Sequence, residues 1–444
     1  MICFDYDRRQ VQPGILHFGV GNFHRAHLEF YLNKLLASGE DLSWGVCGAM
    51  ILPGDEALYK ALKADDGVYE LTVCSADGHR DVYRIGSLVG LEWGIENPEA
   101  IISKIASAQT KIITLTITEG GYKSDNASEG SVFWYVAKGL RLRMEAGLPI
   151  TILSCDNLQH NGDTARRSFM SYFERECPDV AEWAKTNVTF PNSMVDRITP
   201  ATKSGKITDV LCEDFIQWVV EDNFIAGRPQ LEKVGVQFTS DVTPYENMKL
   251  SLLNASHTLL SYPSYLEGFK KVDAVLADSR YRNLLALFMD RDVTPYVEVA
   301  EGIDLTEYKA TLLRRFSNAA ISDQVSRLCG DGIAKFAVYV VPTLSKMLRE
   351  GRDCRIEAFL LASYFKYLCL GHTEDGEIID IFEPHITDKD KETIASGDPD
   401  AFLSLSPFES LKLESQPEFV SEYHQFIAES VAHGLDRILG IVEK

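Results

Sequence analysis

One stretch in the second half of the chain carries a lysine, an asparagine and a histidine at spacings that suit chemistry on an alcohol. Lys249, Asn254 and His257 are five and then three residues apart in a segment expected to be helical. At ~100° per residue, Asn254 lies about 140° and His257 about 80° around the helix axis from Lys249. The three side chains can therefore line one side of a site. Glu246, one turn before Lys249, is placed to pair with it.

These residue types match a reaction that removes a proton from a hydroxyl group. A lysine held away from water loses its proton more readily, and the neutral amine can act as a general base. An asparagine amide can donate a hydrogen bond to an alkoxide or a carbonyl oxygen. The same spacing is compatible with a surface lysine, a helix-interior asparagine and a core histidine, so the pattern by itself leaves both interpretations open.

A second candidate site is the segment Gly19–His24, with the sequence GVGNFH, which follows a strand-like run near the N-terminus. Glycines let the backbone approach a pyrophosphate, and the N–H groups at a helix N-terminus bind its charge. The match is limited to GxG because His24 replaces the third glycine, and an ordinary strand–helix turn is the alternative. The residues expected to bind a dinucleotide here are Gly19, Val20, Gly21, Asn22 and Phe23.

A site for NAD also needs an acidic residue beyond the second strand, where it accepts hydrogen bonds from the ribose. The strand-like run Trp44–Met50 leads to Asp55, which is the candidate. Asp55 is equally compatible with a capping role for the helix that follows. The loop 51–55 contains no Arg or Lys that could receive a 2′-phosphate, which favours NAD over NADP.

Two polar segments elsewhere in the first half are unusual for purely structural loops. The segment 155–162 (CDNLQHNG) ends a strand-like run, and the segment 190–200 reads FPNSMVDRITP. In open α/β sheets, ligands collect at the carboxyl ends of strands. Both segments also have the composition of ordinary turns rich in Asn, Asp and Pro.

The elements that must position these residues differ between the two halves of the chain. In the first half, strands are predicted at 14–20, 44–50, 111–118 and 150–154, and helices at 25–38 and 131–146. Strands that alternate with helices predict a parallel sheet with helices on both faces. The almost continuous apolar character of these strands suits burial on both sides.

In the second half, the pattern predicts helices almost throughout. They are expected at 246–260, 281–290, 308–316, 324–339, 356–370 and 417–442, with surface loops at 371–376 and 386–400. The Thr243-Pro244 turn marks the expected boundary, because proline disfavours helix in the preceding residue. Length alone allows about two or three domains. The change of pattern predicts two, a dinucleotide-binding domain over 1–245 and a substrate and catalytic domain over 246–444.

Composition and charge exclude several classes of function. The chain has 444 residues, with 44 Lys and Arg against 65 Asp and Glu, so its net charge is −21. Such a charge repels nucleic-acid backbones and anionic membrane surfaces, although a local basic pocket for a small anion is compatible with it. The longest apolar stretch, 358–370, is interrupted by Lys366 and is too short to span a bilayer.

The cysteines and the N-terminal residues indicate a cytoplasmic protein. Nine cysteines are present, none in a CxxC pair, which fits neither a disulfide framework nor a zinc finger. Free thiols suit a reducing compartment. The first fourteen residues contain no apolar run long enough for a signal peptide.

Taken together, these segments resemble the polyol-specific long-chain dehydrogenases, the family of mannitol 2-dehydrogenase and its sugar-acid reductase relatives. The resemblance is carried, in order, by HFGVGNFHRAH (17–27), LTITEGGY (115–122), CDNLQHNG (155–162), FPNSMVDRITP (190–200), KLSLLNASHTLL (249–260) and SRLCGDGIAKF (326–336). It implies a zinc-independent, NAD(P)-dependent oxidoreductase. The implied fold is α/β, with an N-terminal Rossmann-type parallel-sheet domain and a mainly α-helical C-terminal domain.

The resemblance also implies a role for individual residues. Lys249 corresponds to the general acid/base, and Asn157 and Asn254 to the pair that polarises the reacting oxygen. Glu246 corresponds to a carboxylate that relays the proton of the lysine to solvent. The residues that the resemblance places at the substrate are His257, Asp196, Arg327 and Lys335, and the motif at 115–122 adds Thr118 and Glu119 to the cofactor site. No metal ligand is implied.

The resulting hypothesis is hydride transfer between NAD and a polyol/ketose pair, of the mannitol/fructose type. One alternative is a reductase of a keto sugar acid such as fructuronate, because Arg327 and Lys335 could bind its carboxylate. An arabinitol- or sorbitol-specific dehydrogenase is another. A catalytically silent nucleotide sensor on the same scaffold is disfavoured, because Lys249, Asn157 and Asn254 are all present. The expected state is a monomer or homodimer without a nucleic-acid or membrane partner.

Overall fold

Two structural units make up the chain. The structure, a computed structural model, describes residues 1–39, 41–200 and 205–441. Unit 1 is Met1–Thr243 and unit 2 is Pro244–Lys444. This division lies close to the boundary expected after residue 245. The turn expected at Thr243-Pro244 is instead the start of α8 (Thr243–Met248), so the residue before the proline is helical.

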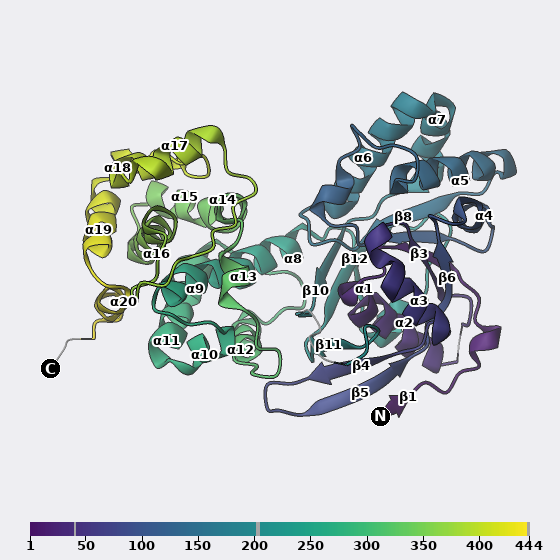
Figure 1. Cartoon of the computed structure of the whole chain (residues 1–444), viewed down its shortest axis with the longest axis horizontal. Helices are drawn as coiled ribbons and strands as arrows, with labels where there is room; N and C mark the ends of the chain where they lie inside the picture. Colours follow the sequence, from purple (N-terminus) through teal and green to yellow (C-terminus); the bar gives the residue numbers. More distant parts are fainter. Residues whose placement is uncertain (40, 201–204, 442–444) are drawn as a thin grey trace. The chain divides into compact units, whose positions relative to one another are not determined.

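The apolar runs of unit 1 form a parallel sheet, as predicted (Figure 1). The strand order is β6-β3-β2-β7-β8-β9, and every neighbouring pair is parallel. The strands are β2 (Ile15–Phe18), β3 (Val46–Met50), β6 (Leu88–Trp93), β7 (Ile112–Leu115), β8 (Ile150–Ser154) and β9 (Val188–Thr189). Because the strand order reverses at β2, the carboxyl ends of β2 and β7 flank the point where open α/β sheets bind ligands.

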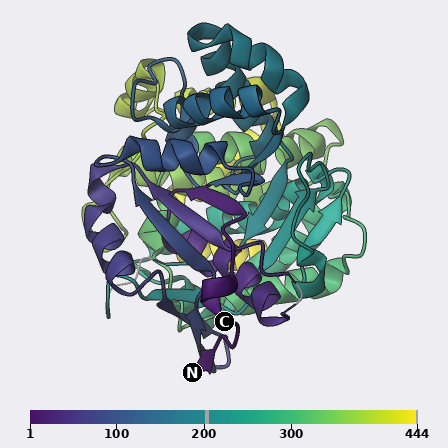
Figure 2. The same cartoon turned by 90° about the vertical axis from the view of Figure 1, so that its right-hand side faces the viewer.

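Alternate residues of these strands pack against opposite layers. Leu16 of β2 and Ile113 of β7 belong to one core, which they share with α4 (Pro98–Ala106), α5 (Val132–Ala146), α6 (Asn161–Glu176) and α7 (Pro178–Asn187). Ile15 and Ile112 belong to a second core, shared with α1 (Asn22–Ala26), α2 (Leu28–Ala37) and α3 (Glu56–Ala64). Figures 1 and 2 both show α5, α6 and α7 on one side of the strands. The predicted burial on both faces is confirmed.

Two smaller sheets, which the sequence did not predict, complete unit 1. One has the order β1-β5-β4-β11, with β1 (Ile2–Cys3), β4 (Tyr69–Cys74), β5 (Arg80–Ile85) and β11 (Val210–Glu213). The other has the order β10-β12-β13, with β10 (Ser193–Asp196), β12 (Gln217–Glu221) and β13 (Gln237–Thr239). The strand β10 carries the predicted substrate residue Asp196 at its end.

Unit 2 is built from helices, as predicted. Its α-helices are α8 (Thr243–Met248), α9 (Ala255–Leu266), α10 (Val272–Ala277), α11 (Ser279–Leu287), α12 (Leu305–Phe316), α13 (Val325–Cys329), α14 (Gly332–Lys335), α15 (Val341–Arg349), α16 (Arg355–Phe365), α17 (Asp388–Ser396), α18 (Pro399–Phe402), α19 (Pro417–Ala428) and α20 (Val431–Leu439). Within residues 244–441, π-helical segments continue several of these helices, at η5 (Lys249–Asn254), η6 (Phe288–Val293), η8 (Phe336–Val340) and η9 (Lys366–Leu370).

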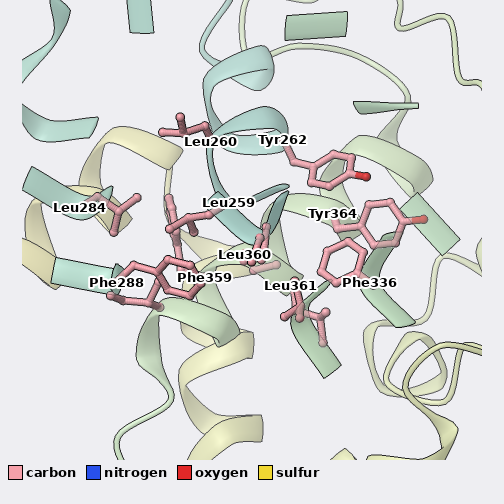
Figure 3. Close-up of a cluster of buried hydrophobic side chains, with 14 of the residues drawn as sticks. Leu259, Leu260, Tyr262, Leu284, Phe288, Phe336, Phe359, Leu360, Leu361 and Tyr364 are labelled. Carbon is pink, nitrogen blue, oxygen red and sulfur yellow. The ribbon is translucent and has the colours of Figure 1, made fainter. Parts of the chain in front are cut away.

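The core of unit 2 forms around α9 and α16 (Figure 3). The ring of Tyr364 lies 4.7 Å from the rings of both Tyr262 and Phe336, measured between centroids. Gly332 lies against the same rings, and a Cβ at this position would come within 2.4 Å of the Tyr262 hydroxyl. The core therefore fixes where α14, the helix that carries Lys335, begins.

Several predicted elements differ from the observed ones. The segment 386–400, expected to be a loop from its acidic composition, forms α17 and α18. The side chain of Thr387 and that of Asp390 cap the start of α17 reciprocally, which stabilises a helix that composition disfavours. The helices predicted at 25–38, 324–339 and 417–442 are each interrupted, at His27, at Gly330-Asp331 and at Glu429-Ser430 respectively. Residue 442 lies outside the described residues.

The cysteines and the apolar stretches of the chain determine whether it has disulfides or membrane-spanning helices. All nine cysteines, each among the described residues, are unpaired thiols. In the described part of the chain, no helix has both the length and the apolar character needed to cross a bilayer.

Candidate active site

Gly19 makes the turn between β2 and α1. Its φ of +96° is a left-handed conformation that favours glycine, and a Cβ here would lie 2.0 Å from the Thr116 carbonyl oxygen. Thr116 Oγ1 donates to the Gly19 carbonyl at 2.7 Å, and His17 Nε2 donates to the same oxygen at 3.0 Å. The predicted dinucleotide turn therefore packs directly on the segment that follows β7.

The turn leaves room and charge for an anion at the start of α1. Gly21 is the N-cap and offers no side-chain hydrogen bond, so the first N–H groups of the helix have no partner within it. A Cβ at Gly21 would meet nothing closer than the Gly19 carbonyl oxygen at 3.8 Å. The buried guanidinium of Arg25 donates to Asn22 Oδ1 at 2.8 Å and to the Gly21 carbonyl at 3.3 Å. Arg25 is 1% exposed and also donates to the Thr208 carbonyl, so it holds the turn in shape. The open space and the helix N–H groups fit a pyrophosphate.

A chain of buried polar groups lies beneath this turn. Thr114 Oγ1 lies 2.8 Å from His17 Nδ1, and the His17 ring stacks on His24 at 3.4 Å between centroids. His24 Nε2 is 3.4 Å from Glu29 Oε1, and Ser87 Oγ donates to the other oxygen of that carboxyl. Burial lowers the pKa of His17 to about 3 and raises the pKa of Glu29 to about 8. Burial also lowers the pKa of His24, so the histidine that replaces the third glycine is a neutral core residue.

The raised pKa of Glu29 predicts a stability that declines as pH rises. In the unfolded chain the carboxyl ionises near the ordinary glutamate pKa of 4.5, whereas in the folded protein it keeps its proton until about pH 8. Between these values the folded state binds the additional proton, so the free energy of unfolding falls by about 1.4 kcal/mol per pH unit from this group. We expect Glu29→Gln to flatten this decline, measured as thermal midpoints from pH 6.5 to 8.

That pH window separates Glu29 from its neighbours. Burial lowers the pKa of His17 and of His24, so their contribution to the slope has the opposite sign, is half its full size at pH 6.5, the ordinary histidine value, and fades within about one pH unit above it. Asp55→Asn, at a partly exposed carboxyl, is a control that should keep the wild-type slope. A Glu29→Gln variant with the same slope as the wild-type protein would contradict a protonated Glu29.

Thr118 and Glu119 lie on an exposed segment after β7. Thr118 has φ +63° and ψ 169°, which is rare for a β-branched residue and costs about 1–3 kcal/mol. The Asp156 carboxylate accepts the backbone N–H of Ile117 at 3.0 Å and that of Thr118 at 2.8 Å. A residue that follows β8 thus holds the loop that follows β7.

Asn157 is exposed on the turn between β8 and α6, and a neighbouring amide ties this turn to β10. The buried Nδ2 of Asn161 donates to the carbonyls of Asp156 at 3.0 Å and of Ser193 at 2.8 Å. Ser193 begins β10, which ends at the buried Asp196. Within unit 1, hydrogen bonds therefore join the segments that carry the predicted cofactor and substrate residues.

Asp55 lies after β3, the strand next to β2. It ends the 3-10 helix η2 (Pro53–Asp55) and occupies the N-cap position of α3, but its side chain makes no capping hydrogen bond. Partial burial raises the pKa of its carboxyl. Asp55 thus occupies the capping position without capping the helix through its side chain. Its role at the ribose stays a prediction.

In unit 2, the helix predicted for the catalytic residues is not a regular α-helix. Glu246 lies on α8, Lys249 begins the π-helix η5, Asn254 ends it, and His257 lies on α9. A π turn holds more residues than an α turn, so the angles expected for a regular helix are wrong for these side chains. Glu246 and Lys249 are both buried, at 4% and 7% exposure. Among the described residues, Asn254 Oδ1 is buried without a hydrogen-bond partner.

His257 lies among aromatic and cationic side chains. Its ring centroid is 4.2 Å from that of Phe316. Burial lowers the pKa of His257 to about 3, and the cations Arg327 and Lys335 contribute in the same direction. The structure thus brings three of the predicted substrate residues together and keeps this histidine neutral at physiological pH.

The two cations of this group are held by neighbouring segments. Arg327 Nε donates to Asp323 Oδ1 at 2.8 Å, and a second guanidinium nitrogen donates to the other carboxylate oxygen. Lys335 Nζ donates to the Leu328 carbonyl at 2.9 Å. The Glu383 carboxylate accepts the first two N–H groups of α14, at 2.9 and 3.1 Å, and so fixes the helix that carries Lys335.

Some residues of the site were not found from the sequence. Asp156, Asn161 and Arg25 lie inside the motifs at 155–162 and 17–27, where their polar side chains were the available signal. For Asp323, the only sequence signal was its spacing of four residues from Arg327, which allows an ion pair on one helix face. Over residues 1–39, 41–200 and 205–441, no three His, Cys, Asp or Glu side chains cluster so as to hold a metal ion.

Two family models match almost the whole chain. The model of the mannitol dehydrogenase Rossmann domain matches residues 13–233. The model of the mannitol dehydrogenase C-terminal domain matches residues 241–430. The two matches follow the division into units 1 and 2.

Individual relatives agree with this match. The polyol:NADP oxidoreductase of Gluconobacter oxydans (strain 621H) is 37% identical over 438 residues, which cover 91% of this chain and 90% of the relative. A D-sorbitol dehydrogenase in substrate-free form has a TM-score of 0.90 at 34% identity, over 98% of this chain and 97% of that one. Mannitol 2-dehydrogenase from Pseudomonas fluorescens, in a ternary complex with NAD and D-mannitol, has a TM-score of 0.84 at 35% identity, over 99% and 96%. The chain belongs to the mannitol dehydrogenase family.

Proposed function

We propose that this chain is an NAD-dependent oxidoreductase that transfers a hydride between NAD and a polyol/ketose pair of the mannitol/fructose type. Membership of the mannitol dehydrogenase family supports this reaction class. The names of the relatives given above describe them as polyol oxidoreductases or dehydrogenases. One of them is described in a complex with NAD and D-mannitol. The turn at Gly19, with its open helix N-terminus, supports dinucleotide binding in unit 1.

The observation that carries the proposal is the buried Lys249 on a π-helix, in a segment that also presents Asn254 and His257. Lys249 acts as the general acid/base and takes the proton of the substrate hydroxyl. His257 is unsuited to that role, because an imidazole with a pKa of about 3 is a weak base. It instead orients a hydroxyl group through hydrogen bonds. Glu246, buried one turn before Lys249, passes the proton on.

The developing alkoxide is stabilised by amides. Asn254 and Asn157 donate hydrogen bonds to the reacting oxygen, and each such donor typically lowers the barrier by about 3 kcal/mol. Bound NAD supplies the acceptor for the hydride. The amides and the lysine together take the place of a Lewis acid, so the proposed reaction is independent of zinc. Asp196, Arg327 and Lys335 bind the other hydroxyl groups.

NAD is proposed as the main cofactor. Asp55 follows the strand next to β2, where a carboxylate accepts from the ribose hydroxyls and repels a 2′-phosphate. One relative is named for NADP, so use of NADP at lower efficiency is compatible with the family.

A keto sugar acid is the second candidate substrate, and the surroundings of Arg327 weigh against it. A uronate needs an uncompensated cation for its carboxylate. Both carboxylate oxygens of Asp323 already accept from Arg327. Lys335 Nζ donates to a neutral backbone carbonyl, which leaves its positive charge uncompensated. The pairing of Arg327 with Asp323 favours a neutral polyol, whereas Lys335 is the cation that an anionic substrate would need.

A substrate panel tests the proposal. Purified protein is mixed with NAD or NADP and mannitol, sorbitol or arabinitol, and with NADH and fructose or fructuronate, while the absorbance of the reduced nicotinamide is followed. We expect activity with at least one polyol/ketose pair, higher kcat/KM with NAD than with NADP, and rates unchanged by a chelator. Heat-inactivated protein gives the blank.

Each result assigns the substrate class directly. Activity on fructuronate alone would defeat the polyol assignment. Inactivity with every polyol, ketose and uronate, in protein that binds NADH, would favour the silent nucleotide sensor. Loss of activity with the chelator, restored by zinc, would contradict zinc independence.

A further inference from the structure

The buried carboxylate of Asp156 bridges the ends of two adjacent strands in unit 1. Asp156 follows β8 and is 7% exposed. Its two oxygens accept the N–H groups of Ile117 and Thr118, at 3.0 and 2.8 Å, and the hydroxyl of Tyr122 at 2.6 Å. All three donors belong to the segment that follows β7. Since β7 and β8 are parallel neighbours, one side chain fixes both strand ends.

The segment that Asp156 holds is strained and exposed. Thr118 keeps a φ of +63°, which L-residues with branched side chains rarely adopt. Such a conformation persists only where the surroundings over-determine it, and here two consecutive N–H groups point at one carboxylate. Hydrogen bonds to an ionised acceptor are stronger than those between neutral groups. Thr118 and Glu119 are thereby presented beside the Gly19 turn, which rests on Thr116.

The backbone of Asp156 is also fixed, next to Asn157. The Asp156 carbonyl accepts from Asn161 Nδ2 at 3.0 Å, and Leu158 N–H donates to the same oxygen at 2.9 Å. The side chain of Asp156 therefore points to the predicted cofactor segment, while its backbone sets the turn that presents Asn157. No role was assigned to Asp156 by the sequence motif that contains it.

We propose that Asp156 is a positioning residue that couples dinucleotide binding at the Thr118–Glu119 segment to the placement of Asn157 at the reacting oxygen. This inference rests on the proposed function. Asp156 touches neither substrate nor cofactor. Loss of its carboxylate releases the strained segment after β7 and removes the side-chain anchor of residue 156 beside Asn157, so both cofactor affinity and turnover decline.

The test compares Asp156→Asn with Asp390→Asn in the full-length protein. Asp390 is also buried, at 1% exposure, and its carboxylate also accepts two backbone N–H groups, from Thr387 and Ser406, but in unit 2. The measurements are the Kd for NADH by fluorescence, kcat at saturating NAD and polyol, and the thermal midpoint. If the Asp156 carboxylate had only a structural role, Asp156→Asn would change the thermal midpoint but not the Kd for NADH or kcat.

We expect Asp156→Asn to raise the Kd for NADH and to lower kcat by about tenfold each, the effect of losing one charge-assisted hydrogen bond. Asp390→Asn should lower the thermal midpoint and leave Kd and kcat at wild-type values. Tyr122→Phe removes one of three donors but keeps both backbone N–H groups, so it should raise the Kd by only about two- to threefold.

The outcomes separate the inference from the proposed function. If the wild-type protein oxidises a polyol and both Asp156→Asn and Tyr122→Phe keep the wild-type Kd and kcat, the inference is overturned while the proposed function stands. If Asp156→Asn does not fold, Tyr122→Phe decides, and an unchanged Kd overturns the inference. If the wild-type protein binds NADH without oxidising a polyol, the proposed function fails and the Kd values still decide the inference. A wild-type protein that does not bind NADH overturns both.

Discussion

Replacing Lys249 with alanine is expected to lower kcat for polyol oxidation by about a hundredfold to ten-thousandfold, the range that a positioned general acid or base contributes. The variant lacks the group proposed to take the hydroxyl proton, and the neutral His257 cannot replace it. The Kd for NADH should stay close to the wild-type value, because the residues proposed to bind the dinucleotide lie in unit 1. Steady-state kinetics and NADH fluorescence measure the two quantities.

A second buried lysine of unit 2 provides a matched control. Lys366 is 8% exposed, begins the π-helix η9 and donates to the Glu429 carbonyl. Lys366→Met removes a buried ammonium and keeps an apolar stem, so it should lower the thermal midpoint without lowering kcat. If Lys249→Ala retained the wild-type kcat at neutral pH, or if Lys366→Met lost as much, Lys249 would not be the general acid/base.

Truncation of Asn254 is expected to lower kcat by about a hundredfold to a thousandfold, the effect of removing one donor to a developing oxyanion. Within the described part of the chain, Asn254 Oδ1 has no hydrogen-bond partner, so truncation breaks no hydrogen bond of this oxygen. Asn254→Ala should therefore change the thermal midpoint little. Asn254→Asp keeps the shape, removes the amide donor and adds a negative charge, so it should be at least as slow. KM should change less than kcat, because the interaction strengthens in the transition state.

An exposed amide in the same unit controls for truncation itself. Asn283→Ala, on the surface of α11, should leave kcat, KM and the thermal midpoint unchanged. An Asn254→Asp variant with wild-type kcat would contradict the proposed donor. A loss of kcat accompanied by an equally large fall in the thermal midpoint would assign Asn254 a structural role instead.

Strands made of continuous apolar or β-branched residues were predictable, and a strand with polar, partly exposed side chains was not. The runs Ile112–Leu115 and Ile150–Ser154 are fully buried, so their apolar and β-branched residues mark them as strands without reference to the rest of the chain. By contrast, Arg80–Ile85 is largely polar and partly exposed. This strand pairs with β4, which is close in sequence, and with β1, which is distant. A local sequence pattern does not show the distant partner.

The same limit explains the acidic segment at 386–400. Its composition predicted a solvated loop, yet Asp390 is buried and accepts from the backbone of Ser406 as well as from Thr387. A carboxylate with this many donors stabilises a helix start that a charge pattern alone disfavours. The N–H group that Asp390 accepts from Ser406 lies sixteen residues away, so the local sequence does not show that Asp390 has this partner.

The sequence alone predicts which residues carry the proposed chemistry and which kinds of element hold them. Residue types and spacing indicate the candidate lysine, the amides and the glycine turn. Local periodicity distinguishes buried strands from amphipathic helices. Both kinds of pattern are present within a few consecutive residues. The tertiary structure alone decided that Lys249–Asn254 winds as a π-helix, that burial and neighbouring cations keep His257 neutral, and that Asp156 restrains Thr118 across 38 residues of chain. These features depend on contacts between distant segments, and only the packed fold brings such segments together.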